Sequence, residues 1–164
     1  MRQFLLGEDM AKEQMLIAGE WCDSEDGATS DVLNPATGEV IATTPKATIS
    51  DVERCVQASR AALKSKEWAM MDPAQRGRVL QKMAAATYAN AKSLAALESA
   101  NNGKTFREAL SEVRYGAWTL EYFAGLSDKI EGSTIPVPGS RLNYTLKQPL
   151  GVTAHIVPWN FPLQ

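Results

Sequence analysis

The fold of this chain is decided by the stretch Gln148-Pro149-Leu150-Gly151-Val152-Thr153-Ala154-His155-Ile156-Val157-Pro158-Trp159-Asn160-Phe161-Pro162-Leu163-Gln164. Residues 151–157 form a nearly continuous apolar run rich in β-favouring side chains, with a proline on either side. This pattern predicts a strand buried on both faces, as in a parallel sheet. Parallel strands are joined by crossovers of about a dozen residues or more, and only residues 158–164 follow this run. We therefore expect the first strand of a doubly wound sheet that this chain leaves incomplete.

Further motifs make the chain resemble the aldehyde dehydrogenase superfamily from about Leu16 onward. They occur in the order and at about the spacing of that family: Asn34-Pro35-Ala36-Thr37-Gly38-Glu39, Asn102-Gly103-Lys104, Tyr122-Phe123-Ala124-Gly125, Pro149-Leu150-Gly151-Val152 and Ile156-Val157-Pro158-Trp159-Asn160-Phe161-Pro162-Leu163. The enzymes of this family are much longer than this chain. The resemblance therefore implies an amino-terminal fragment.

The resemblance also implies a fold and its division into parts. The fold class is α/β, the amino-terminal part of an aldehyde dehydrogenase-like fold. It would contain β-hairpins, a helical layer, an extended oligomerisation arm and the first strand of an incomplete Rossmann-like sheet. Residues 1–130 would belong to the cofactor-binding domain, 131–148 to the arm, and 149–164 to the return into the cofactor-binding domain with the Pro-Trp-Asn-Phe-Pro loop. The catalytic domain would be absent.

Composition excludes several classes of function. The chain has 17 basic and 19 acidic residues, a net charge of −2, which argues against a nucleic-acid partner. The apolar residues Phe4–Leu6 are too few for a secretory signal, and no run approaches the ~20 apolar residues of a membrane span. We expect a cytoplasmic protein without a membrane partner. Cys22 and Cys55 lie outside any metal-ligand pattern, so no metal site or disulfide is predicted.

Turn and capping signals predict the order of the local elements. Hairpin-like pieces at 16–22 and 31–33 precede a turn at 34–38. Capping residues then predict a helix from Ile49 to Leu63, a second that opens at Asp72-Pro73-Ala74-Gln75, with 92–100 as its continuation, and a third from the box Thr105-Phe106-Arg107-Glu108 to about Leu126.

The helical sequences also predict which side chains are buried. Cys55 lies on an apolar stripe of the first helix with Ile49 and Val52, so we expect a buried, inert thiol there. The third helix carries an aromatic band that is broader than one stripe. We expect it to pack against both the sheet and another element or a partner subunit. The band consists of Trp118, Tyr122 and Phe123.

Residues 141–148 alternate between apolar and polar side chains, with Leu142, Tyr144 and Leu146 on one face. This alternation predicts a half-exposed antiparallel strand. The resemblance implies that it is the family's oligomerisation arm, which would make the full-length relative a homo-oligomer.

Asn160 is the candidate catalytic residue. A neutral amide cannot act as a useful base near pH 7, but it can donate a hydrogen bond to an oxyanion, and such pre-oriented donors contribute about 10²–10³ in rate. The residues alone favour an asparagine that only satisfies its loop. The resemblance instead assigns Asn160 to the oxyanion formed when a cysteine thiolate attacks an aldehyde.

In the same family, hydride passes to NAD or NADP, and a glutamate helps water to hydrolyse the thioester. The strand end and loop that border the nicotinamide and its ribose correspond to Ile156, Val157, Pro158 and Trp159. His155, the sole histidine, has no predicted partner for a Ser–His or Cys–His mechanism.

The chain also departs from the family pattern. Neither cysteine matches the family's nucleophile, and Asn101 stands where many members carry an aspartate that binds a structural cation. The resemblance thus implies oxidation of an aldehyde to a carboxylic acid in the full-length relative and no activity for the fragment alone. The alternatives are a non-enzymatic interaction module that pairs through 141–148, or a truncated relic that exposes a sheet edge and aggregates.

Overall fold

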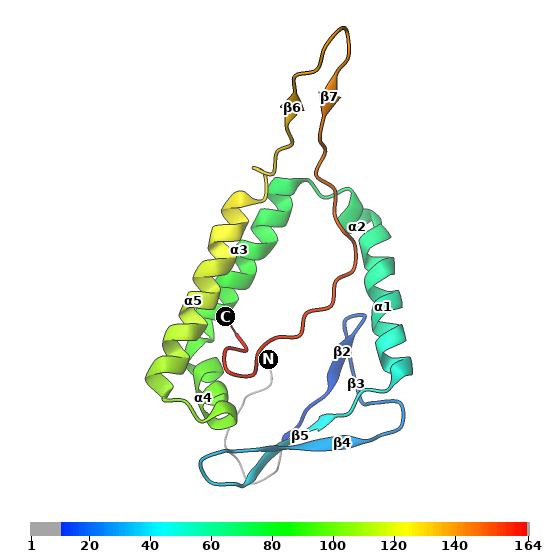
Figure 1. Ribbon diagram of the computed structural model, residues 1–164. Helices are drawn as coiled ribbons and strands as arrows, with labels where there is room; N and C mark the ends of the chain where they lie inside the picture. Colours follow the sequence, from blue (N-terminus) through cyan, green and yellow to red (C-terminus); the bar gives the residue numbers. More distant parts are fainter. Residues whose placement is uncertain (1–10, 164) are drawn as a thin grey trace.

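The computed structural model describes residues 11–163. The brief apolar run at 4–6 and the terminal Gln164 lie outside the described residues. Figure 1 shows a pair of long helices on one side, a shorter helical segment on the other, a small sheet below, and a hairpin that projects beyond the helices. The end of the chain runs back from this hairpin between the two helical sides. Among residues 11–163, no helix is long and apolar enough to cross a membrane.

The predicted hairpins at the start of the chain are confirmed. Strand β2 (Met15–Ile17) pairs antiparallel with β3 (Glu20–Cys22), and β4 (Thr29–Leu33) pairs antiparallel with β5 (Val40–Pro45). The short β1 (Ala11–Lys12) adds to β5 in parallel. The turn between β4 and β5 follows from its sequence, because the Asn34 side chain accepts a hydrogen bond from the Ala36 N–H at 2.9 Å and Gly38 adopts a positive φ of 76°.

Helix α1 (Ile49–Lys64) begins where its capping signal predicts. The Thr48 hydroxyl accepts from the Asp51 N–H, and the Asp51 carboxylate accepts from the Thr48 N–H. Its predicted buried stripe is wrong: Ile49 is 82% exposed, and Cys55 is exposed. An apolar stripe is buried only where another element covers it, and within the described residues the Ile49 and Cys55 side chains are left uncovered. The short helix α2 (Lys66–Ala69) follows directly.

The hydrophobic core lies among α3 (Pro73–Ala89), α4 (Ala91–Asn102) and α5 (Phe106–Leu126). Both predicted capping boxes are present, Asp72 with Gln75 and Thr105 with Glu108. The predicted continuation at 92–100 is a separate helix. The best-buried cluster is built mostly of small side chains, which lets the helices approach closely: Ala91, Ala95, Ala109 and Val113, with Leu94 and Leu110 packed against them.

The aromatic band of α5 stays on the surface of the described chain. Trp118 is 51% exposed and lies between the tilted rings of Tyr115 and Tyr122, at centroid distances of 5.4 and 6.0 Å. The expectation that this band packs against the sheet is therefore wrong. That the band packs against another element or a partner subunit stays a prediction.

Residues 131–148, the predicted arm, contain a hairpin of two very short strands, β6 (Thr134–Ile135) and β7 (Asn143–Tyr144). They pair antiparallel with each other, as Figure 1 shows at the projecting end. The predicted strand over 141–148 is confirmed only at β7. The rest of that range has no strand assignment, because β6 is only two residues long. One further backbone bond, from the Thr145 N–H to the Ser133 carbonyl at 2.9 Å, continues the pairing.

The predicted buried strand at 151–157 is wrong. This segment has no regular secondary structure, Gly151 adopts a φ of 114°, and Ile156 is 99% exposed. A strand forms only when its backbone N–H and C=O groups meet those of a neighbour. No parallel neighbour for this segment exists within residues 11–163, so the apolar run is left unpaired.

Candidate functional site

The Pro-Trp-Asn-Phe-Pro loop turns back onto the junction between α4 and α5. Its backbone is held there by two side chains from the Asn102-Gly103-Lys104 motif. The Asn102 amide Nδ2 donates to the Trp159 carbonyl oxygen at 2.8 Å, and the Lys104 ammonium donates to the Asn160 carbonyl oxygen at 2.7 Å. Two successive carbonyls of the loop are thus attached to residues more than fifty positions earlier in the chain.

Lys104 is positioned by the end of α4. Gly103 takes the left-handed conformation that ends this helix, with a φ of 83°. The Ser99 hydroxyl then donates to the Lys104 carbonyl at 2.7 Å, which fixes the lysine backbone directly after the turn. A side chain at Gly103 would lie 2.8 Å from Pro35 Cγ, so the turn also packs closely against the Asn34–Gly38 turn.

The Lys104 ammonium also bridges two carboxylates. It lies 2.7 Å from Glu98 Oε1 and contacts Glu112, and the Lys104 side chain is only 11% exposed. Burial by itself would lower the pKa of Lys104, but the hydrogen bonds to Glu112 and Glu98 outweigh it and raise this pKa. Burial raises the pKa of Glu98, against the opposing effect of Lys104. The Phe161 ring covers the ammonium, at 4.9 Å from its centroid.

The predicted catalytic residue, Asn160, is exposed at the surface of this loop. Within the described chain its backbone carbonyl is engaged, while its side-chain amide makes no hydrogen bond to residues 11–163. An amide with a fixed backbone and free N–H groups can donate to an oxygen that develops negative charge.

The other predicted site residues form one apolar edge that leads into the loop. Ile156 is 99% exposed, Val157 61% and Trp159 85%, and Pro158 is also exposed. Such an edge can form one wall of a ligand pocket, because apolar and aromatic groups commonly line such pockets. It encloses nothing by itself.

The remaining candidate groups do not gather at this loop. Cys55 lies on α1, across the molecule from α4 in Figure 1, and Cys22 lies on β3. His155 bonds only to its near neighbour Thr153, at 2.9 Å. Among residues 11–163, no three His, Cys, Asp or Glu side chains group as metal ligands.

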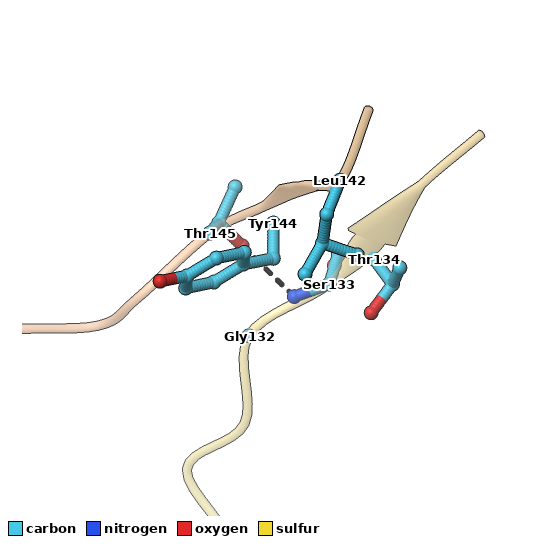
Figure 2. A pocket seen from close by; sticks show the side chains of 6 residues that line it. All are labelled: Gly132, Ser133, Thr134, Leu142, Tyr144 and Thr145. Atoms are coloured by element: carbon cyan, nitrogen blue, oxygen red, sulfur yellow. Dashed lines mark hydrogen bonds between the residues drawn. The ribbon is translucent and has the colours of Figure 1, made fainter. Parts of the chain in front are cut away.

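Two shallow cavities lie elsewhere. One, of about 380 Å³, opens at the base of the arm, where the Ser133 N–H donates to the Thr145 hydroxyl at 2.8 Å (Figure 2). The other, of about 320 Å³, lies between the α1–α2 segment and residues 151–153. Neither is lined by the Pro-Trp-Asn-Phe-Pro loop.

A comparison of the sequence with known protein families agrees with the resemblance that the motifs indicate. Residues 21–164 match the model of the aldehyde dehydrogenase family. This chain belongs to the aldehyde dehydrogenase family. The resemblance read from the sequence is thereby confirmed, and so is the fold class as the amino-terminal part of that family's fold.

Individual members of the family support this assignment, and the aldehydes in their names differ. The chain is 42% identical to hydroxyisobutyraldehyde dehydrogenase of Mycolicibacterium austroafricanum over 149 residues, 91% of the chain and 29% of that protein. It is 42% identical to retinal dehydrogenase 2 of Mus musculus over 152 residues, 92% of the chain and 29% of that protein. The chain therefore spans less than a third of the length of these relatives.

Its structure resembles that of a betaine aldehyde dehydrogenase double mutant from Staphylococcus aureus, in complex with NAD+, with a TM-score of 0.86 and 36% identity. The match covers 92% of this chain and 30% of that one. Most of the described fold is thus arranged as in a solved member of the family.

Sequence reasoning missed the residues that hold the loop. It singled out the Asn102-Gly103-Lys104 motif as a family signature and gave it no role, and it did not name Glu98 or Glu112. A signal was available: a glutamate on the helix before the motif and another on the helix after it, beside a lysine. Only the folded chain shows that both glutamates bind the Lys104 ammonium and that Lys104 in turn binds the backbone of the loop.

Proposed function

We propose that this chain supplies the oxyanion-binding loop of an NAD(P)-dependent aldehyde dehydrogenase that oxidises an aldehyde to a carboxylic acid. The observation that carries the proposal is the hydrogen bonding of Asn160. Its backbone carbonyl is bonded to Lys104 at 2.7 Å, while its amide has no partner within the described chain. A donor held in this way requires little reorganisation when an oxyanion forms, which is the condition for electrostatic stabilisation.

In this mechanism, Asn160 donates to the oxygen of the aldehyde as a thiolate adds to its carbonyl carbon. Ile156, Val157, Pro158 and Trp159 form the wall beside the nicotinamide and its ribose, and exclude water from that side. Bound NAD(P)+ would supply the hydride acceptor there. Cys22 lies on β3 and Cys55 on α1, and neither belongs to the cluster at the α4–α5 junction that holds the loop. The thiolate therefore comes from outside residues 1–164, and the chain alone is inactive.

The substrate is assigned only to the class of aldehydes. The named relatives include a hydroxyisobutyraldehyde dehydrogenase and a retinal dehydrogenase. They differ in the aldehyde of their names and are equally similar to this chain.

Steady-state kinetics of the active enzyme that contains these residues tests the role of Asn160. Asn160→Ala should lower kcat by about 10²–10³-fold, the usual cost of losing one oxyanion donor. Asn90→Ala is the matched control, because this asparagine donates to the Ala86 carbonyl at 2.7 Å, far from the loop in the chain. Equal kcat values for the wild type and Asn160→Ala would refute the role.

The intact mass of the natively expressed product separates the enzyme from its alternatives. A mass near 17.9 kDa would favour the interaction module or the relic. A mass close to that of the relatives, of which this chain covers 29% to 31%, would favour the dehydrogenase. Formation of NAD(P)H from an aldehyde by the pure 164-residue chain would contradict its proposed inactivity.

We also propose that residues 131–148 act as the arm of a homo-oligomer. The observation that favours this is a row of exposed apolar side chains on and beside the projecting hairpin. In this row, Leu142 is 75% exposed and Leu146 is 70% exposed. Analytical ultracentrifugation tests this, by comparing the wild type with the double variant that carries both Leu142→Lys and Leu146→Lys. The wild type should associate with rising concentration, and the double variant should not; identical sedimentation of both would contradict the arm.

A further inference from the structure

The loop that carries Asn160 is joined to the rest of the described chain through its backbone. Asn102 Nδ2 reaches the Trp159 carbonyl at 2.8 Å, and Lys104 Nζ reaches the Asn160 carbonyl at 2.7 Å. These carbonyls belong to the two peptide groups that flank the Asn160 α-carbon. Fixing both peptide groups limits the backbone rotations that would swing the Asn160 side chain.

Lys104 is well suited to hold a carbonyl in place because all its donors are used. An ammonium group has three N–H donors. The acceptors here are Glu98, Glu112 and the Asn160 carbonyl, in one cluster. Two anionic acceptors fix the nitrogen, and the third direction is left for the loop. Charge-assisted hydrogen bonds of this kind are stronger than neutral ones.

The burial of this cluster shows that it is built into the fold. The Glu98 side chain is 2% exposed and the Lys104 side chain 11%. Glu98 Oε2 is buried and has no hydrogen-bond partner within the described chain, so Lys104 is the cation that compensates this carboxylate. A buried charge without a partner is costly. The ammonium is therefore held where it is by its own ion pairs, whether or not the loop is present.

We propose that Lys104 and Asn102 are positioning residues that orient the Asn160 amide, with Glu98 and Glu112 holding the Lys104 ammonium. The catalytic part of this proposal rests on the proposed role of Asn160 as oxyanion donor. The geometric part, that these side chains order the loop, is independent of that role and is measured separately.

Backbone ¹⁵N relaxation of the 164-residue chain tests the geometric part. In the wild type, the order parameter of the Asn160 backbone N–H should approach the value of about 0.85 that marks rigid backbone. In Lys104→Met it should fall below the ~0.6 that marks flexibility. Lys92→Met, an exposed lysine on α4, is the matched control and should leave the loop rigid. A rigid loop in Lys104→Met, or a flexible one in the wild type, would overturn the proposal.

Asn102→Ala provides a second variant that changes no charge. It removes only the bond to the Trp159 carbonyl among the contacts of the loop, so it decides the question if Lys104→Met does not fold. The Asn160 order parameter should again fall below about 0.6 while that of α5 stays near 0.85. An unchanged loop in Asn102→Ala would remove this residue from the proposal.

A double-mutant cycle in the active enzyme measures the catalytic part. Lys104→Met should lower kcat by about 10–10²-fold with little change in KM, since misplacement of a group by about 1 Å can cost this much. In the Asn160→Ala background the same substitution should change kcat less than about twofold, because the amide it positions is gone. Equal losses in both backgrounds would show a general structural effect. An unaffected kcat in Asn160→Ala alone would instead refute the oxyanion role and leave the relaxation result standing.

Discussion

Val113 offers a sharp test of where the stability of this chain resides. It is fully buried in α5 and packs in the cluster formed with Ala91, Ala95 and Ala109. Removing one buried methylene costs about 0.5–1.5 kcal/mol, so Val113→Ala, which removes two carbon atoms, should cost about 1–3 kcal/mol through lost contacts and a new cavity. Alanine returns about 0.5 kcal/mol of helix propensity. We expect a net loss of about 1.5 kcal/mol.

The assay is urea unfolding followed by circular dichroism at the helical signal. Val52→Ala is the matched control, because it makes the same substitution in a helix at a side chain that is 54% exposed. Its stability should stay within about 0.5 kcal/mol of the wild type. Equal losses in both variants would refute the assignment of the core to α3, α4 and α5. An unfolding transition without cooperativity in the wild type would instead favour the relic.

The other predictions concern helix packing and pH. Gly77→Ala should destabilise the chain by about 1–3 kcal/mol, because its Cβ would lie 2.7 Å from the Ala124 carbonyl oxygen at the contact of α3 with α5; an unchanged urea midpoint would contradict this close approach. The Thr48 N–H, and after it the Arg54 guanidinium, hold the pKa of Asp51 well below its ordinary value of 3.8. This contribution to stability is complete above that value and is lost as the pH falls below it toward the folded-state pKa. The stability difference between the wild type and Asp51→Asn should therefore shrink on going from pH 6 to pH 3, and parallel pH profiles would contradict it.

Local elements could be predicted wherever the signal lies within a few residues. The capping boxes at Thr48 and Asp72 bond N-cap and N3 groups three positions apart, so the sequence alone contains both partners. The turn that begins at Asn34 is closed by its own side chain. Burial could not be read in the same way, since the stripe through Ile49 and Cys55 has helical spacing and is still exposed.

The C-terminal segment shows the same limit for strands. Its apolar run at 151–157 predicts a parallel strand, and the residue types are right for one. A strand is a pairwise structure, however, and its hydrogen bonds belong equally to its neighbour. Without that neighbour among the described residues, the run has no regular secondary structure and is exposed.

The sequence by itself determined the family, the order of the helices and hairpins, and the candidate asparagine in its proline-bounded loop. These depend on motifs and on contacts between near neighbours in the chain. Only the tertiary structure decided how that loop is held. The bonds of Asn102 and Lys104 to the Trp159 and Asn160 carbonyls join residues 57 and 56 positions apart. Contacts at such separations leave no periodic trace in a single sequence, because they depend on how complete helices and turns pack against one another.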